Sequence, residues 1–198
     1  MRKRPLEVKA PRTRKRFPNR PLTAEQIKML LAQVDNARDN ALIRLGLSVG
    51  LRVSEIMGIR ASDIDFERGT ITIWDEKKDK FREVMPPRDT LSAVKIYLNS
   101  LAKPNQYLFD FSKKTAERVI QKYSHSALGF TISWHALRHT YVARSIELGV
   151  PQSVVMANTG DSPATILRHY AQLPEPVMRR IVEDKPIIPA SSVGIAEQ

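Results

Sequence analysis

Apolar residues recur every three or four positions along most of the chain, and this helical spacing constrains the fold more than any other feature. Only one segment, Thr70–Trp74, alternates with the period of two that is typical of a strand. The sequence therefore predicts a mainly α fold with one small antiparallel β-hairpin, an α+β domain. In the first helical segment the apolar face consists of Ile27, Leu30, Leu31 and Val34.

Residues with strong capping and breaking preferences divide this helical pattern. Thr23–Gln26 has the composition of a capping box, Asp39 is a candidate cap for the second helix, and Gly50 ends that helix. Ser162 is a candidate cap for another helix, with Pro163 at its first helical position. We expect the other helices over residues 52–58, 91–101, 113–127, 135–148, 152–158, 163–170 and 177–182, and the hairpin over 70–74 and 81–85 with a charged turn at 75–80.

Positive charge is concentrated at the start of the chain. The 198 residues carry a formal net charge of +11, and residues 1–20 contribute +8 through nine basic residues and one acid. A strongly basic chain most often has a polyanionic partner, usually nucleic acid. We expect residues 1–21 to form a flexible basic arm or linker along DNA phosphates, although a leader that only improves solubility has the same composition. The candidate phosphate contacts in this arm are Arg12, Arg14, Lys15 and Arg16.

Composition also excludes several classes of protein. The chain has no cysteine, which excludes a disulfide scaffold, a thiolate metal site and a cysteine nucleophile. That absence suits a reducing compartment, and we expect the cytoplasm. No window approaches about 18 consecutive apolar residues, so no membrane span is expected. The basic N-terminus is not followed by an apolar stretch, so no secretory signal is expected either.

Four separated groups of residues carry candidate chemistry. Residues 50–56 place an arginine at a helix start with an acid one turn later, and residues 77–82 are rich in lysine and arginine at a hairpin tip. Residues 135–139 read His-Ala-Leu-Arg-His, and Tyr170 lies at the end of an expected helix.

The two histidines of the third group raise the question of a metal site. His135 and His139 are four residues apart on a helix, a spacing that can bind a metal. However, no glutamate follows His135 as the zinc-protease motif requires, and Arg138 beside them repels a cation. We therefore expect no metal and no other cofactor.

In this order the four groups resemble the motifs of the tyrosine recombinases, the family of phage integrases and Xer-type resolvases. The hairpin group departs from the family pattern only in Lys78, which stands in place of glycine. The family motifs and the residues that match them are Gly-Leu-Arg-x-Ser-Glu (50–55), Lys-Gly-x-Lys-x-Arg-x-Val (77–84), His-x-Leu-Arg-His (135–139) and a nucleophile helix end (165–170).

The resemblance covers residues 22–182 and implies the catalytic-domain fold of this family. We therefore expect a catalytic domain over residues 22–183 and a C-terminal tail over 184–198. In the family a C-terminal segment docks on a neighbouring protomer, so the resemblance implies a homo-tetramer on double-stranded DNA. The family's N-terminal helical domain has no counterpart here, and an excised fragment and a natural short form both remain open.

The resemblance implies a site-specific recombinase that cuts and rejoins DNA through a 3′-phosphotyrosyl link, without ATP or a metal. Tyr170 is then the nucleophile, and Arg52 and Arg138 hold the phosphate. Guanidinium groups suit this task because they are planar donors that stay protonated at neutral pH. Lys77 is the expected general acid for the leaving 5′-oxygen, and its neighbour Lys78 is the alternative.

Other residues of the four groups are candidate helpers. His135 is expected to accept the tyrosine proton or to hold the phosphate, and Glu55 to orient Arg52 or a neighbouring basic group. His139 is either a helper or a buried structural histidine. The candidate DNA contacts near the hairpin are Lys80 and Arg82.

One position departs from the family pattern. The family has Leu-Gly-His nine residues before the nucleophile, where the histidine, or sometimes a tryptophan, donates to the phosphate. Here that position is Asp161, and an ionised aspartate cannot donate. Asp161 is expected to cap the following helix instead. This departure keeps a second function open, that of a DNA-binding accessory protein on the same scaffold with weak or lost catalysis.

Overall fold

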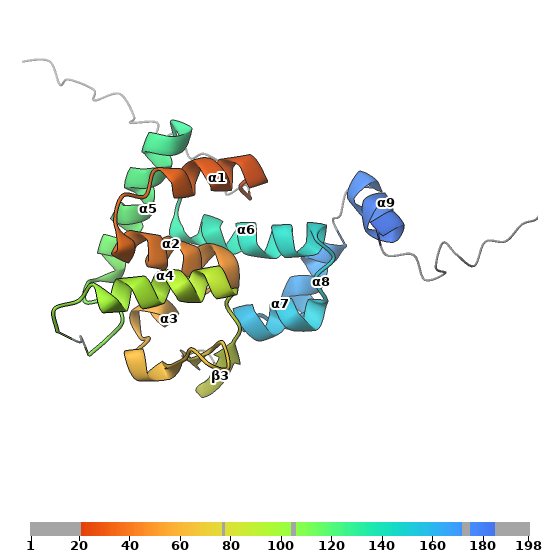
Figure 1. The fold of residues 1–198 in the computed structure, drawn as a ribbon. Helices are drawn as coiled ribbons and strands as arrows, with labels where there is room; N and C mark the ends of the chain where they lie inside the picture. The colour runs from red at the N-terminus through yellow and green to blue at the C-terminus, as the bar shows by residue number, and fades with distance from the viewer. Residues whose placement is uncertain (1–20, 77, 104–105, 172–174, 185–198) are drawn as a thin grey trace, which may run out of the picture.

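The computed structural model describes residues 21–76, 78–103, 106–171 and 175–184. Helices dominate these residues, as the periodicity predicts (Figure 1). In chain order the elements are α1 (Ala24–Ala32), α2 (Ala37–Val49), α3 (Val53–Met57), a 3₁₀ turn η1 (Ala61–Asp63), β1 (Ile64–Asp65), β2 (Thr70–Asp75), β3 (Lys80–Val84), α4 (Arg88–Asn99), α5 (Lys113–Leu128), α6 (Trp134–Glu147), α7 (Gln152–Thr159), α8 (Pro163–Tyr170) and α9 (Glu175–Asp184).

Side-chain caps determine where several helices begin. The capping box predicted for α1 is confirmed, because the Thr23 hydroxyl accepts a hydrogen bond from the Gln26 amide (3.2 Å) and the Gln26 side chain accepts one from the Thr23 amide (3.0 Å). The prediction that Asp39 caps α2 is wrong. The Asn36 side chain is the cap and accepts from the Asp39 amide (2.9 Å), while the Asp39 carboxylate binds the Tyr123 hydroxyl (3.0 Å).

Two of the helices that begin earlier than predicted do so next to proline. α4 begins at Arg88, directly after Pro87, whereas the apolar pattern placed its start at residue 91. α9 begins at Glu175 and includes Pro176 in its first turn, where the missing N–H is not needed by the helix. The apolar positions report which face of a helix is buried, so they miss polar residues in a first turn.

The strands form a three-stranded antiparallel sheet in the order β1-β2-β3. The predicted hairpin is β2 with β3, in which Ile71 lies opposite Val84 and Ile73 opposite Arg82. The third strand, β1, was not predicted, because a segment of two residues has no detectable alternation.

Asp75 lies at the end of β2 rather than in the predicted turn, and Lys80 is the first residue of β3. Asp75 is in phase with the buried Ile71 and Ile73, and it is itself only 1% exposed. The alternation of β2 thus carries a carboxylate into the interior, next to the end of α7.

Two hydrophobic clusters hold the helices together, and α6 takes part in both. The first half of α6 contributes Trp134 and Leu137 to the main core, which also contains the buried residues of α2, α4, α5 and the sheet. The second half contributes Tyr141 and Val142 to a smaller cluster with α7 and α8, around Ile166. In Figure 1, α6 runs from the main body towards α7 and α8. Residues in the middle of α6 therefore lie at the junction of the two clusters.

The last described helix, α9, lies at the edge of the fold, beyond the end of α6 (Figure 1). Arg180 of α9 donates to the Glu147 carbonyl at the end of α6 (2.8 Å). None of the helices in the described ranges has the length and apolar character needed to cross a bilayer. Residues 1–20 and 185–198, which include nearly all of the predicted arm and tail, lie outside the described residues.

Gly50 ends α2 in the left-handed conformation, with φ of +66°, and it lies against α6. A methyl group there would be 2.6 Å from Cδ1 of Tyr141. Gly129, at the end of α5, has φ of +74°, but a methyl group there would meet nothing within 4 Å. The two glycines thus share one backbone requirement and differ in packing.

We expect Gly50→Ala to lower the free energy of unfolding more than Gly129→Ala. Both changes cost about 1–2 kcal/mol of left-handed strain. Gly50→Ala adds about 1–3 kcal/mol because the Tyr141 ring must move. Urea denaturation of the two variants measures the difference. Equal losses would mean that α6 does not pack tightly on the end of α2.

Candidate active site

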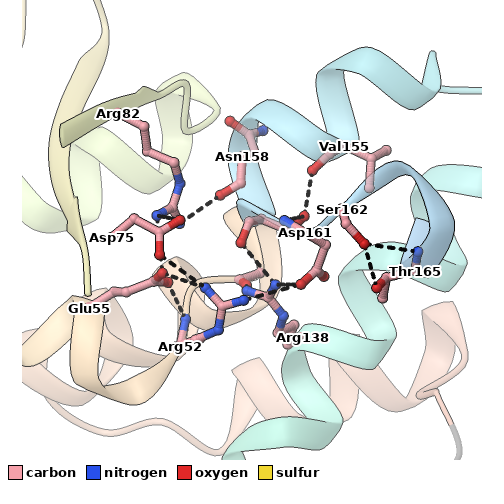
Figure 2. A network of polar contacts seen from close by, with 12 residues as sticks. Arg52, Glu55, Asp75, Arg82, Arg138, Val155, Asn158, Asp161, Ser162 and Thr165 are labelled. Atoms are coloured by element: carbon pink, nitrogen blue, oxygen red, sulfur yellow. Dashed lines mark hydrogen bonds and ion pairs between the residues drawn. The ribbon is translucent and has the colours of Figure 1, made fainter. Parts of the chain in front are cut away.

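Arg138 lies in the middle of α6, and its side chain is only 6% exposed. Its Nη1 donates to the Gly50 carbonyl (2.7 Å) and its Nη2 to the Thr159 carbonyl (2.8 Å). These carbonyls belong to the ends of α2 and α7, where no helical N–H is available to bind them. Burial lowers the pKa of Arg138, while the nearby carboxylate of Asp161 acts in the opposite direction. Arg138 therefore joins three helices at one point (Figure 2).

Arg52 directly precedes α3, and Glu55 in the first turn of that helix holds it in place. The Arg52 amide donates to Glu55 Oε2 (2.7 Å), and its Nη1 donates to Glu55 Oε1 (2.9 Å). A glutamate three residues after a helix start can reach back to this amide, which explains the spacing of the two residues. Glu55 thus contacts both the backbone amide and the guanidinium group of Arg52.

Asp161 lies between the two arginines. Its Oδ1 is 2.6 Å from Nη2 of Arg138 and 3.2 Å from Nη2 of Arg52. Figure 2 shows the two guanidinium groups side by side with this carboxylate at their edge. The prediction that Asp161 caps α8 is wrong, because Ser162 is the cap and accepts from the Thr165 amide (3.3 Å).

Behind Arg52 lies a further arginine with its own carboxylates. Arg82 of β3 donates to Glu55 Oε1 (3.0 Å) and lies 3.5 Å from Asp75 Oδ2. It also donates to the Asn158 carbonyl at the end of α7 (3.3 Å). With its side chain only 11% exposed, Arg82 faces the interior and contacts two carboxylates there, whereas the sequence predicts a DNA contact for it.

The six residues of this network are called the arginine–carboxylate cluster below. It contains three guanidinium groups and three carboxylates, so its formal charge is zero. Its members are Arg52, Arg82, Arg138, Glu55, Asp75 and Asp161.

Three histidine side chains lie beside the cluster. The ring centroids of His135 and His139 are 4.5 Å apart, and those of His139 and His169 are 5.7 Å apart. Desolvation, and then the neighbouring histidines and Arg138, lower the pKa of His139. This shift favours the neutral form of the His139 imidazole. All three line a cleft of about 370 Å³ together with Arg52, Arg138 and Asp161.

The predicted general acid and nucleophile are only partly covered by the structure. Lys77 lies outside the described residues, while Lys78 is exposed in the hairpin turn and Lys80 is exposed at the start of β3. Tyr170 is the last residue of α8, and its side chain lies outside the described part. The backbone of α8 begins directly after Asp161 and Ser162, so the expected nucleophile is on the helix that adjoins the arginines.

Several functional partners were missed by the sequence reasoning. Asp75 could have been found, since it continues the inward phase of Ile71 and Ile73 along β2. The carbonyls of Gly50 and Thr159 leave no signal in the sequence, because every residue has a carbonyl and only the packing of α6 selects these two.

A larger hollow of about 480 Å³ lies beside the sheet, where Trp74, Phe81 and Tyr107 are among its lining residues. Neither Arg52 nor Arg138 lines this hollow, so we do not take it as the candidate active site although it is the larger of the two. Within the described ranges, no group of three or more histidine, aspartate or glutamate side chains is arranged to hold a metal ion.

Two curated relatives are similar over most of this chain. Tyrosine recombinase XerA of Pyrococcus furiosus is 28% identical over 173 residues, which cover 82% of this chain and 60% of the relative. A tyrosine recombinase of Pseudothermotoga lettingae is 32% identical over 165 residues, covering 80% of this chain and 58% of the relative. The chain thus spans about 60% of the length of these relatives.

Solved structures share the fold. A crystal structure of XerA recombinase matches with a TM-score of 0.72 at 24% identity. The match covers 83% of this chain and 64% of the XerA chain. The Tn1549 transposon integrase in complex with transposon right end DNA matches with a TM-score of 0.68 at 22% identity, covering 86% of this chain and 67% of its own. The predicted mainly α fold of a tyrosine recombinase catalytic domain is confirmed.

The family comparison covers the part of the chain that holds the site. The sequence profile of the phage integrase family matches residues 20–175, well over half of the chain. This range contains all four groups of candidate catalytic residues and every member of the arginine–carboxylate cluster. The chain belongs to the phage integrase family.

Proposed function

We propose that this chain cuts and rejoins DNA strands as the catalytic part of a site-specific recombinase or integrase. The observation that carries the proposal is the pair of guanidinium groups of Arg52 and Arg138, whose Nη2 atoms approach a single oxygen. Two arginines directed at one anionic oxygen suit a phosphodiester, which presents such oxygens and gains negative charge in the transition state. The names of the relatives, which are tyrosine recombinases, support the same reaction.

In the proposed reaction the Tyr170 hydroxyl attacks the scissile phosphorus. A bond forms between the tyrosine oxygen and phosphorus, and the bond from phosphorus to the 5′-oxygen breaks. His135 accepts the tyrosine proton or holds the phosphate, and Lys77, or its neighbour Lys78, gives a proton to the leaving 5′-oxygen. The phosphodiester energy stays in the phosphotyrosyl link, so the reverse attack by a 5′-hydroxyl rejoins a strand without ATP.

The proposed DNA contacts are basic residues other than the members of the arginine–carboxylate cluster. Lys80 is exposed at the start of β3, and the arm residues Arg12, Arg14, Lys15 and Arg16 add charge that would bind phosphates without reading sequence. Double-stranded DNA is the proposed partner, and the Tn1549 integrase has been solved with DNA. A homo-tetramer on DNA and a cytoplasmic location complete the proposal.

An accessory DNA-binding role is the second candidate function, and one observation favours it. Asp161 holds a carboxylate where a phosphate donor is expected, and a carboxylate repels phosphate. Against this role, both arginines are present and held by hydrogen bonds. Arg52 donates to the Glu55 carboxylate, and Arg138 donates to two backbone carbonyls. Incubation with a nicked duplex separates the two candidates, because only the enzyme forms a DNA-linked protein that survives a denaturing gel.

We expect Tyr170→Phe to abolish this covalent product while DNA binding stays nearly unchanged, because the change removes only the hydroxyl. Gel analysis of nicked duplex gives the product, and fluorescence anisotropy gives the affinity. Tyr141→Phe is the matched control. Its hydroxyl accepts from Asn158 (2.9 Å) inside the fold, so attachment should persist. A phosphotyrosyl adduct mapped to Tyr141 by mass spectrometry would refute the assignment.

We expect Arg52→Lys to slow covalent attachment by about 10²–10³-fold, the range for loss of one positioned donor. Lysine keeps the charge but lacks the planar fork that binds Glu55 and the phosphate together. Single-turnover cleavage measures the rate. Arg68→Lys is the control, since Arg68 is exposed and pairs with Glu83 on the sheet. Equal rates for the two variants would contradict a phosphate-binding role of Arg52.

We expect Lys77→Ala to lose cleavage of ordinary DNA but to regain it when the leaving 5′-oxygen is replaced by sulfur. A thiolate departs without a proton, because thiols are far more acidic than alcohols, so the general acid is no longer needed. Lys78→Ala is the matched comparison. If Lys78→Ala instead shows the loss and the rescue, the general acid is Lys78.

A further inference from the structure

A carboxylate side chain fills the position between the two arginines. Asp161 Oδ1 lies 2.6 Å from Arg138 Nη2 and 3.2 Å from Arg52 Nη2 (Figure 2). An anionic oxygen shared by two guanidinium groups is the arrangement that a phosphodiester oxygen needs. We call the space occupied by this carboxylate oxygen the anion seat.

The contacts of Arg138 show why a second anion cannot bind fully in this seat while Asp161 occupies it. Each terminal nitrogen of a guanidinium carries two hydrogens. Nη2 of Arg138 donates one to the Thr159 carbonyl (2.8 Å), and the same nitrogen lies 2.6 Å from Oδ1 of Asp161 in an ion pair. While Asp161 stays in place, its oxygen therefore occupies the contact position on this nitrogen that a phosphate oxygen would need.

The charge of the arginine–carboxylate cluster leads to the same conclusion. Its three guanidinium groups are balanced by three carboxylates, and two of these, Glu55 and Asp75, are almost fully buried. A phosphodiester carries one negative charge. Adding it beside Asp161 brings two anions together in a partly desolvated site, which costs more than in water. Exchanging it for Asp161 keeps the cluster neutral.

The backbone around Asp161 allows its side chain to leave without unfolding. The Asp161 amide donates to the Thr159 hydroxyl (3.2 Å), and Ser162 caps α8 independently. The Asp161 side chain is 17% exposed and borders the cleft, whereas Glu55 is 3% exposed. Of these two carboxylates, Asp161 is the one that rotation about its side-chain bonds can bring into solvent.

We propose that Asp161 is an internal competitor of the DNA phosphate. Its carboxylate occupies the anion seat between Arg52 and Arg138 in the free chain, and it turns away when a phosphodiester binds. The proposal rests on the proposed function in one respect, because it takes these two arginines as the phosphate clamp. It predicts a set direction: neutralising Asp161 strengthens the binding of tetrahedral oxyanions.

Titration of the chain with inorganic phosphate at constant ionic strength, followed by calorimetry, tests this direction. Asp161→Asn keeps the shape of the side chain and removes its charge, so phosphate should bind about tenfold tighter or more. Glu76→Gln removes one negative charge at an exposed position after β2 and should change the affinity by less than about twofold. The double variant Asp161→Asn, Arg52→Ala should lose the gain.

Binding by Asp161→Asn that is equal to or weaker than that of the unchanged chain would overturn the proposal. Asp161 would then orient the arginines rather than compete for them. Circular dichroism checks that the variant is folded, and Asp161→Ser serves as a second neutral variant. In the unchanged chain, the carboxyl ¹³C resonance of Asp161 should shift on saturation with phosphate. The proposal would also be overturned if phosphate shifted the arginine resonances but left the Asp161 carboxyl resonance unchanged.

Phosphate binding is scored without any strand cleavage, so this test is separate from that of the proposed function. If Tyr170 forms no covalent product while Asp161→Asn gains phosphate affinity, the anion seat stands and the recombinase proposal fails. If the covalent product forms and Asp161→Asn gains nothing, the reverse holds.

Discussion

The buried hydrogen bonds from Arg138 to the carbonyls of Gly50 and Thr159 hold the site together. They connect the ends of α2 and α7 to the middle of α6, at the junction of the two hydrophobic clusters. A buried guanidinium needs such partners, because desolvation without them is costly. The same guanidinium faces the cleft through its contact with Asp161. The residue that fixes the helix ends is therefore also the one that meets an anion.

The carboxylates around the arginines determine what the site can accept. Glu55 contacts both Arg52 and Arg82, and Asp75 supports them from the end of β2. A buried ion pair contributes little net stability when its desolvation is counted, but removing one partner is strongly destabilising. The value of this arrangement is positional, since it directs Arg52 towards the cleft. Of the three carboxylates of the cluster, Asp161 alone lines the cleft.

Much of the architecture could be predicted from local patterns. The capping box at Thr23, the hairpin and most helices follow from short-range propensities and periodicity, which act within a few residues. The errors also have local causes. Asn36 and Asp39 are both residue types that can cap a helix, and the structure has Asn36 as the cap of α2. β1 has only two residues, too few to show alternation of apolar and polar side chains. Arg82 was expected on DNA because its charge suggested exposure, yet the phase that buries Ile71 and Ile73 on β2 turns the opposite position of β3 inward.

The sequence by itself determined the family motifs, the helical class of the fold and the identity of the arginines, because these depend on residue types at fixed spacings. Only the tertiary structure decided which groups meet. Arg52, Arg138 and Asp161 come from three segments far apart in the chain, and their distances depend on how α6 packs against α2 and α7. Long-range packing also turned Asp161 from an expected helix cap into a bridge between two guanidinium groups. No local pattern carries that information, since the partners of a side chain are set by the whole core.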